Sequence, residues 1–282
     1  MLQHFPVDGG SLAMDVRTAD TAPVLALHGV TSHRRLWNWV TAREPGLSLI
    51  APDLRGRGDS SDITGPFSLR QHTEDLLRVL DALQINEIIV CGMSMGGFLG
   101  VDLAVRHPDR VSELVLLDGG FPMAGHDKLT PEMVPLAFAP EFALMERTWP
   151  DLDEYVAVHA AANSLLSADD PLLRDYFAHS LADGRVRLNR DAVLSDAKDV
   201  FFGEPQWREL TVPTRLVYAE WSVGKDSSPA YTPDAVAGFE AELDCLAPSV
   251  RVSTVDHGTL MMSQTGAAAV AEVLVEVCGK RD

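Results

Sequence analysis

Short apolar stretches recur along the chain, with little of the polar alternation that marks a strand with one face in water. Four of them have the composition of strands buried on both faces of a parallel sheet: Val24–His28, Leu47–Ala51, Glu87–Cys91 and Glu113–Asp118. Before them, Phe5–Val7 and Leu12–Val16 flank Asp8-Gly9-Gly10, whose glycines favour the tight turn of a hairpin. Thr214–Ala219 and Val250–Val255 repeat the strand pattern near the end of the chain.

Helical patterns separate these strands. They cover Leu69–Leu83, Met95–Arg106, the region near Pro233–Leu246, and a final stretch from about Thr265 to Val277. Ser68 can cap the first helix, with Gln71 completing a capping box. The buried stripe of that helix is expected at Leu69, Leu76, Leu80 and Leu83. Alternation of strand and helix predicts an α/β sheet with helices on both faces.

Residues 121–207 interrupt this alternation. The segment contains prolines among short amphipathic helical stretches and no convincing strand, yet it holds 10 of the 19 aromatic residues. We interpret it as a helical cap, or lid, inserted into a core made of residues 1–120 and 208–282. The aromatic side chains either cover a pocket or simply attach the insert to the core, and both interpretations stay open.

Composition narrows the class of protein. The 282 residues are 46% hydrophobic and carry a net charge of −18, which argues against binding to nucleic acid or to an anionic membrane surface. No stretch approaches the roughly 20 apolar residues of a membrane span. The N-terminus lacks the layout of a signal peptide. Three cysteines at unrelated spacings fit neither a disulfide framework nor a zinc site, so we expect a cytoplasmic protein without a metal.

The motif with the clearest chemistry is Gly92-Met93-Ser94-Met95-Gly96, between a predicted strand and a predicted helix. A G-x-S-x-G turn in that context projects a serine hydroxyl from a strained backbone, and small residues two positions away on each side avoid clashes. The amides at the start of the following helix favour a developing oxyanion. We therefore expect Ser94 to be a nucleophile. The alternative is a glycine-rich turn with a helix-capping serine.

A serine hydroxyl needs a base to remove its proton. Among the histidines that follow Ser94, only His257 comes directly after a late predicted strand, where a loop at the carboxyl edge of the sheet can reach back to the serine. We expect His257 to be that base rather than an exposed loop residue. After an earlier strand, Gly29 allows the amide of Val30 to face Ser94, and the amide of Met95 supplies the second donor of an oxyanion hole.

These residues resemble the α/β-hydrolase superfamily. The matching elements are His28-Gly29, Pro52–Ser60, the elbow at Ser94, His107–Val111 and Asp256-His257-Gly258. The resemblance implies a mostly parallel, eight-stranded sheet flanked by helices, with a helical cap after the sixth strand. It also implies a serine hydrolase that needs no cofactor. In such proteins the Pro52–Ser60 loop is structural, and we assign it no chemistry.

The resemblance leaves two candidates for the third member of a catalytic triad. The family's usual aspartate follows the penultimate strand, but its spacing from Pro213 falls on Ser222 in this chain. Asp226 is four residues later, and a bulged loop could bring it into place. Some branches of the family carry the acid after the strand that follows the elbow, which here ends at Asp118. We favour Asp118 and keep Asp226 as the alternative.

A serine at the elbow favours carboxylic esters and lactones as substrates, and the aromatic-rich insert favours a hydrophobic small molecule. We expect Gly29, Trp149 and Tyr155 to contact it. A C–C bond hydrolase acting on a diketone is an alternative, in which the sequence His33-Arg34-Arg35 would bind a substrate carboxylate rather than form a solvated helix start. From a different class, the chain could be a non-catalytic ligand-binding protein with this fold. Whether it forms a homodimer stays open.

Overall fold

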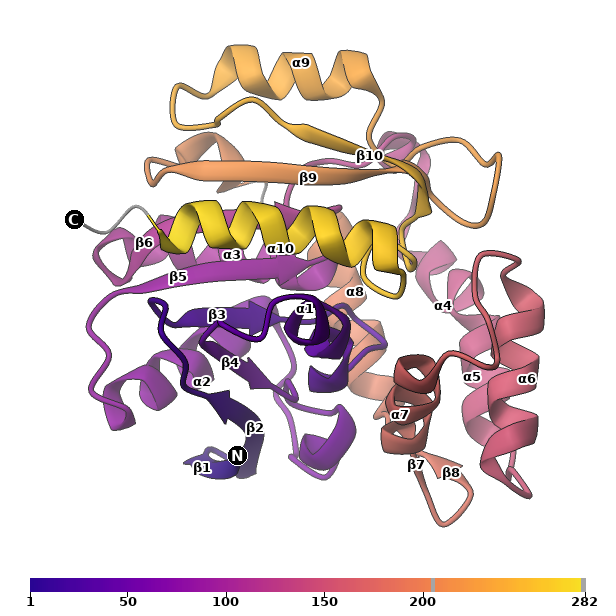
Figure 1. Ribbon diagram of the computed structural model, residues 1–282. Helices are drawn as coiled ribbons and strands as arrows, with labels where there is room; N and C mark the ends of the chain where they lie inside the picture. Colours follow the sequence, from indigo (N-terminus) through magenta and orange to yellow (C-terminus); the bar gives the residue numbers. More distant parts are fainter. Residues whose placement is uncertain (204–205, 280–282) are drawn as a thin grey trace.

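The computed structural model describes residues 1–203 and 206–279. Its main sheet has eight strands in the order β1-β2-β4-β3-β5-β6-β9-β10 (Figure 1). They are β1 (Leu2–Val7), β2 (Gly10–Arg17), β3 (Val24–Leu27), β4 (Leu49–Pro52), β5 (Ile88–Met93), β6 (Val111–Leu117), β9 (Thr214–Trp221) and β10 (Val250–Asp256). The pairings of β1 with β2 and of β2 with β4 are antiparallel, and the other pairings are parallel. The predicted fold class is confirmed.

Helices cover both faces of this sheet. One apolar layer contains residues of α1 (Asn38–Arg43) and α10 (Gln264–Cys278), and the helix α10 crosses in front of the sheet in Figure 1. The other layer contains residues of α2 (Leu69–Ala82), α3 (Met95–Arg106) and α9 (Pro233–Glu242). Successive strand residues alternate between the layers, and all residues of β3, β4 and β5 are buried. Continuous apolar runs therefore form strands with no face in water.

The start of α2 follows the prediction in one respect and departs from it in another. Ser68 Oγ accepts a hydrogen bond from the backbone N–H of Gln71 at 3.0 Å, so Ser68 is the N-cap. The Gln71 side chain does not complete the box, because its amide donates to Asp75 at 3.2 Å instead. Leu76 and Leu80 are fully buried, whereas Leu69 and Leu83 are half-buried at the ends of the stripe.

The segment predicted as a cap is mainly helical. Its longer helices are α5 (Ala139–Glu146), α6 (Leu152–Ala162), α7 (Pro171–Ser180) and α8 (Arg190–Phe202), after the short α4 (Val134–Ala137). Figure 1 shows α4 to α7 gathered at one end of the sheet. That this segment forms a separate cap, and its limits, stay a prediction, and the word cap denotes residues 121–207. Residues 204–205 and 280–282, which fall in the predicted ranges 121–207 and 208–282, lie outside the described residues.

A small hairpin in this segment was not predicted. The strands β7 (Leu181–Ala182) and β8 (Arg185–Val186) pair antiparallel across Asp183 and Gly184, which both have positive φ angles. Strands of two residues are too short for any alternation to be visible in a sequence. The hairpin attaches to the rest of the cap through the N–H of Trp149, which donates to the Gly184 carbonyl at 2.8 Å.

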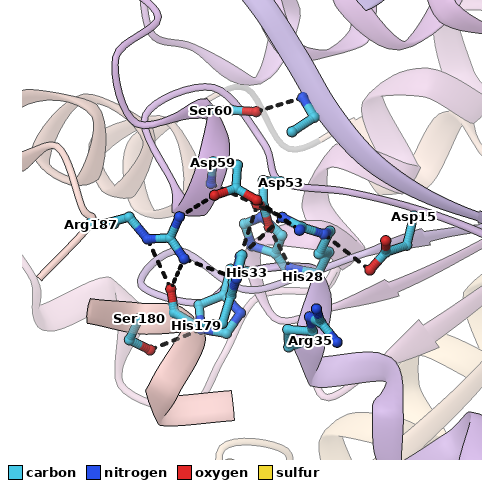
Figure 2. Close-up of polar contacts among 12 residues, drawn as sticks. Asp15, His28, His33, Arg35, Asp53, Asp59, Ser60, His179, Ser180 and Arg187 are labelled. Carbon is cyan, nitrogen blue, oxygen red and sulfur yellow. Dashed lines mark hydrogen bonds and ion pairs between the residues drawn. The ribbon is translucent and has the colours of Figure 1, made fainter. Parts of the chain in front are cut away.

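Buried charges join the cap segment to the core. Arg57, in the loop after β4, pairs with Asp196 of α8, and His72 Nε2 lies 2.9 Å from the same carboxylate. All three side chains are inaccessible to solvent. A second network joins the core to α7 and to the residue after β8. Arg34 contacts Asp53, Asp59 and Asp15. Arg187, which follows β8, contacts Asp59 and His179 (Figure 2). These contacts hold the cap against the carboxyl edge of the sheet.

The sequence predicted neither a membrane span nor a disulfide framework. Within residues 1–203 and 206–279, no helix is both long enough and apolar enough to cross a membrane. In the described part of the chain, Cys91, Cys245 and Cys278 form no disulfide.

Candidate active site

Ser94 occupies the turn between β5 and α3 with φ 55° and ψ −120°, a strained conformation for a residue with a side chain. The flanking glycines make this turn possible. A Cβ on Gly92 would lie 2.0 Å from the Gly96 carbonyl oxygen, and a Cβ on Gly96 would lie 2.3 Å from the Leu27 carbonyl oxygen. Larger residues cannot occupy these two positions without moving the backbone. The motif found in the sequence is thus a strand–turn–helix elbow.

His257 and Asp118 meet beside this turn. His257 Nδ1 lies 2.6 Å from Asp118 Oδ2, and Asp118 is 1% exposed. The other carboxylate oxygen accepts the N–H of Ala219 at 3.1 Å. A carboxylate partner requires the proton on Nδ1, so the neutral ring carries an unprotonated Nε2, the form in which it can act as a base.

The loop that carries Asp118 also touches the serine. The N–H of Ser94 donates to the Leu117 carbonyl at 2.9 Å. A Cβ on Gly119 would lie 2.2 Å from the Ser94 carbonyl oxygen. The end of β6 therefore packs directly on the elbow, and His257 and Ser94 line the same cavity.

The charge state of His257 results from opposing effects. Burial lowers its pKa, but the hydrogen bond and negative charge of Asp118, together with the charge of Asp256, outweigh burial and raise the pKa above its ordinary value. Asp118 thus stabilises the imidazolium that forms when the ring takes a proton.

The alternative acid is elsewhere. Asp226 is exposed, with φ 64°, on the loop after β9. Ser222, at the position where the family's usual acid was expected, accepts a hydrogen bond from the His257 N–H through its carbonyl at 3.3 Å. The structure brings Asp118, rather than Asp226, to His257. The sequence alone left both open because loop conformation decides between them.

The expected oxyanion donors flank the serine. His28 Nδ1 donates to the Gly29 carbonyl at 2.7 Å, while Nε2 accepts from the Leu54 N–H at 2.9 Å. Burial lowers the pKa of His28 to about 4, which keeps the ring in the neutral form that both bonds require. In a planar trans peptide the N–H points opposite to the carbonyl. The His28 bond therefore directs the Val30 N–H away from His28.

Two further contacts fix this peptide next to Ser94. The Arg57 Nε donates to the Val30 carbonyl at 3.0 Å. A Cβ on Gly29 would lie 3.3 Å from the Ser94 Cβ, which favours glycine at that position. Met95 is the first residue of α3, where helix N–H groups have no partner within the helix. Gly29, Val30 and Met95 all line the cavity that contains Ser94.

This cavity has a volume of about 460 Å³ and a mainly apolar wall. Core and cap both contribute to it, through Leu36, Met93, Met123, Phe138, Val200, Phe201, Met261 and Met262 among others. Its charged group is Glu141, an exposed residue of α5. A second cavity of about 260 Å³ shares Ser32, Tyr176 and Met262 with the first.

Two residues expected to bind substrate have other surroundings. Trp149 is buried inside the cap: its indole N–H donates to the Leu144 carbonyl at 3.2 Å, and its ring packs against Tyr155 at 4.8 Å between centroids. Tyr155 lines the second cavity and not the one that contains Ser94. The wall beside Ser94 includes Phe138, Phe201 and Tyr176 instead. The excess of aromatic residues indicated the right segment but not which rings face inward.

The basic stretch after the oxyanion loop is not a substrate site. Arg34 is 3% exposed and bonds the carboxylates of Asp15, Asp53 and Asp59. His33 is also buried, with Nε2 2.9 Å from Ser180 Oγ. Arg35 lies 3.6 Å from Asp175 of α7. Both the carboxylate-binding interpretation and the solvated helix start are therefore wrong for His33 and Arg34, because acidic residues distant in sequence surround Arg34.

Ligand atoms of His33, Asp53 and His179 lie within 4.8 Å of one another, close enough in principle to hold a metal ion. Arg34 Nη1, however, contacts the Asp53 carboxylate and lies 3.0 Å from His179 Nε2. A guanidinium already neutralises this carboxylate. The predicted absence of a metal stays a prediction.

Comparison with known proteins agrees with this geometry. The family model of the alpha/beta hydrolase fold matches residues 22–203, more than half of the chain. The protein belongs to the alpha/beta hydrolase family. The hydrolase superposes on the solved structure of E-2-(acetamidomethylene)succinate hydrolase with a TM-score of 0.77 over 98% of both chains, at 21% identity, which is a likeness of fold.

Two curated relatives of the hydrolase match over shorter segments. Lipase LipV of Mycobacterium tuberculosis is 36% identical over 104 residues, which cover 37% of this chain and 40% of the lipase. The 3-oxoadipate enol-lactonase 2 of Acinetobacter baylyi is 40% identical over 68 residues, which cover 24% of this chain and 26% of the lactonase. The chain thus spans less than half the length of either relative in these matches.

Proposed function

We propose that this hydrolase is a cofactor-independent serine hydrolase that cleaves carboxylic esters or lactones of hydrophobic small molecules. The proposed triad is Ser94, His257 and Asp118. The observation that carries the proposal is the 2.6 Å contact between Asp118 and His257 Nδ1, in the same cavity as a serine on a strained elbow. A histidine held by a carboxylate, beside a serine in one cavity, is the arrangement that makes a serine hydroxyl nucleophilic.

The proposed reaction begins when His257 Nε2 takes the hydroxyl proton as Ser94 Oγ attacks the ester carbonyl carbon. The carbonyl oxygen becomes an oxyanion, stabilised by the amides of Val30 and Met95. Collapse of this intermediate expels the alcohol, which receives the proton from His257, and leaves an acyl group on Ser94. A water molecule, deprotonated by His257, then attacks the acyl carbon. The bond from that carbon to Ser94 Oγ breaks, His257 returns the proton to Ser94 Oγ, and the acid is released.

The lining of the cavity supports a substrate without an anionic anchor. The side chains around Ser94 are mainly apolar, and none of the described residues that line the cavity is a lysine or an arginine. Arg34, which the sequence offered as a residue for binding a substrate carboxylate, already pairs with three carboxylates of the protein. This favours an ester or lactone over a carboxylate-bearing diketone. The lipase and lactonase relatives support the same class of bond. We further propose that residues 121–207 act as a lid over this cavity.

A fluorophosphonate probe tests the proposal, because it reacts with activated serines. We expect labelling of the wild type on Ser94 and no labelling of Ser94→Ala. As a matched control, Ser222→Ala removes another hydroxyl of the same cavity and should leave labelling intact. An unlabelled wild type would contradict the proposal and favour a non-catalytic binding protein. Equal labelling of Ser94→Ala would contradict it by placing the reactive residue elsewhere.

A further inference from the structure

Asp256, the residue before His257, joins three parts of the chain. It is 2% exposed, and its carboxylate accepts four hydrogen bonds. Oδ1 accepts from the N–H and the hydroxyl of Thr259, at 2.8 and 2.6 Å. Oδ2 accepts from the N–H of Gly224, on the loop after β9, and from the side-chain amide of Asn163, both at 2.7 Å. Such a set of donors fixes a buried carboxylate firmly.

Asn163 belongs to the cap, where it ends α6 as the C-cap residue. Its side-chain oxygen accepts the N–H of Leu165 at 3.0 Å, so its NH₂ group must be the part that faces Asp256. Both ends of the amide are thus used. The cap reaches the residue next to the proposed base through this one oriented side chain.

The backbone before Asp256 needs such support. The pairing of β10 with β9 is irregular between Val252 and Asp256, and Thr254 has a φ of 64°. An irregularity of this kind bends a strand and re-aims the side chains that follow it. The direction in which His257 projects therefore depends on contacts made by the residues beside it as well as on the strand ladder.

We propose that Asp256 and Asn163 are positioning residues: when the cap is seated, Asn163 fixes Asp256, and Asp256 fixes the backbone from which His257 reaches Asp118 and Ser94. This inference rests on the proposed function for its effect on turnover. The acidic groups facing His257 are Asp118 from the end of β6, Asp256 on its own loop and Glu141 of the cap, which lines the same cavity. Tyr231 lies near Asp118, and its phenol is buried.

The chain offers a matched control for this contact. Asn38 of α1 donates through its side-chain amide to Asp175 of α7 at 2.8 Å, and this is also an asparagine–aspartate bond between core and cap. This bond is exposed, and neither of its residues bonds Asp256. Asn163→Ala and Asn38→Ala therefore remove the same kind of bond, and only the first one acts on Asp256.

NMR titration of the His257 ring in the two variants and the wild type is the deciding experiment, because it needs no substrate. We expect a lower pKa of His257 in Asn163→Ala, since a loosened ring loses part of its bond to Asp118, and an unchanged pKa in Asn38→Ala. On an ester substrate, Asn163→Ala should lower kcat by about tenfold with little change in KM. Asn163→Asp, which sets two carboxylates against each other, should lower kcat further at neutral pH.

Equal His257 titrations in both variants and the wild type would overturn the inference, and so would equal kinetic losses in Asn163→Ala and Asn38→Ala. Thermal unfolding of each variant shows whether the fold is retained. Failure of the proposed function has a different signature, an unlabelled Ser94 in the wild type, while the titration still decides whether Asn163 orients His257.

Discussion

The sheet and the cap differ in what holds them in place: the centre of the sheet relies on apolar contacts, whereas the cap meets the core through apolar contacts and buried charges together. In β5 every residue from Ile88 to Met93 is buried, and apolar contacts on both faces determine where the strand lies. The cap packs on the core through apolar side chains, such as Tyr176 beside Trp39, and adds charged pairs without solvent contact, such as Arg57 with Asp196, which are 139 residues apart in sequence. Apolar burial is non-directional, whereas a buried ion pair stabilises only when both partners are present. We therefore expect substitutions in the two regions to differ in their effects on turnover and on the free energy of unfolding.

The largest effect should come from the elbow, which belongs to the sheet. Ser94→Ala or His257→Ala should lower turnover by about 10⁵–10⁶-fold, because the nucleophile and its base act as a unit. The fold should persist, since neither side chain contributes to the apolar layers. The rate of ester hydrolysis measures the loss of turnover, and circular dichroism shows whether the fold is retained. Substantial residual turnover in either variant would mean that the reaction takes place at another site.

The acid gives the next largest effect. Asp118→Asn should reduce turnover by about 10⁴-fold, because an amide cannot hold the histidine tautomer that the reaction needs. Asp226→Asn should stay close to the wild type, since Asp226 is exposed on its loop. Kinetics of the two variants on one ester compare them directly. The opposite ranking would move the acid to the loop after β9.

The contact between cap and core can be broken at Asp196. Asp196→Ala should lower the free energy of unfolding by about 3–5 kcal/mol, because it leaves Arg57 buried without its partner. The matched variant is Glu146→Ala, which breaks the exposed pair with Arg190 and should cost less than about 1 kcal/mol. Denaturant unfolding measures both. Equal losses would mean that buried charge does not hold the cap.

The smallest effect is a pH dependence. Burial lowers the pKa of His257, but Asp118 and Asp256 raise it above its ordinary value, about 6.5. Only the neutral ring is a base, so kcat/KM should fall by about tenfold per pH unit below that raised pKa. Asp118→Asn removes the charge of Asp118, so the fall in kcat/KM should begin at a lower pH in this variant. If kcat/KM falls at the same pH in the variant and the wild type, Asp118 does not set the charge of His257.

The same contrast explains what could be predicted. Unbroken apolar runs predicted the central strands β3, β4, β5 and β6, since burial on both faces leaves a local signal, whereas β1 and β2 were predicted from the glycine turn between them. The elbow also has a local cause, the glycines around Ser94. The start of α2 was predicted only in part, because the Gln71 side-chain amide donates to Asp75 instead of completing a capping box with Ser68. The hairpin β7–β8 is too short to leave any pattern.

Contacts between distant residues could not be predicted. Asp118 and His257 meet across 139 positions, and only the loop conformation excludes Asp226 from that contact. Arg34 was expected to be solvated or to bind substrate, yet acidic residues from three positions in the core surround it. Trp149 was expected in the pocket and supports the cap instead. In each case the partner is specified by the fold and not by neighbouring residues.

The central claim is that Ser94 forms a covalent acyl intermediate. Acid quenching of the hydrolase during turnover of a p-nitrophenyl ester, followed by digestion and peptide mass spectrometry, detects that intermediate directly. We predict the mass of the acyl group on the peptide that contains Ser94, and its absence in Ser94→Ala. Product formation without this adduct, or an adduct on another residue, would contradict the account.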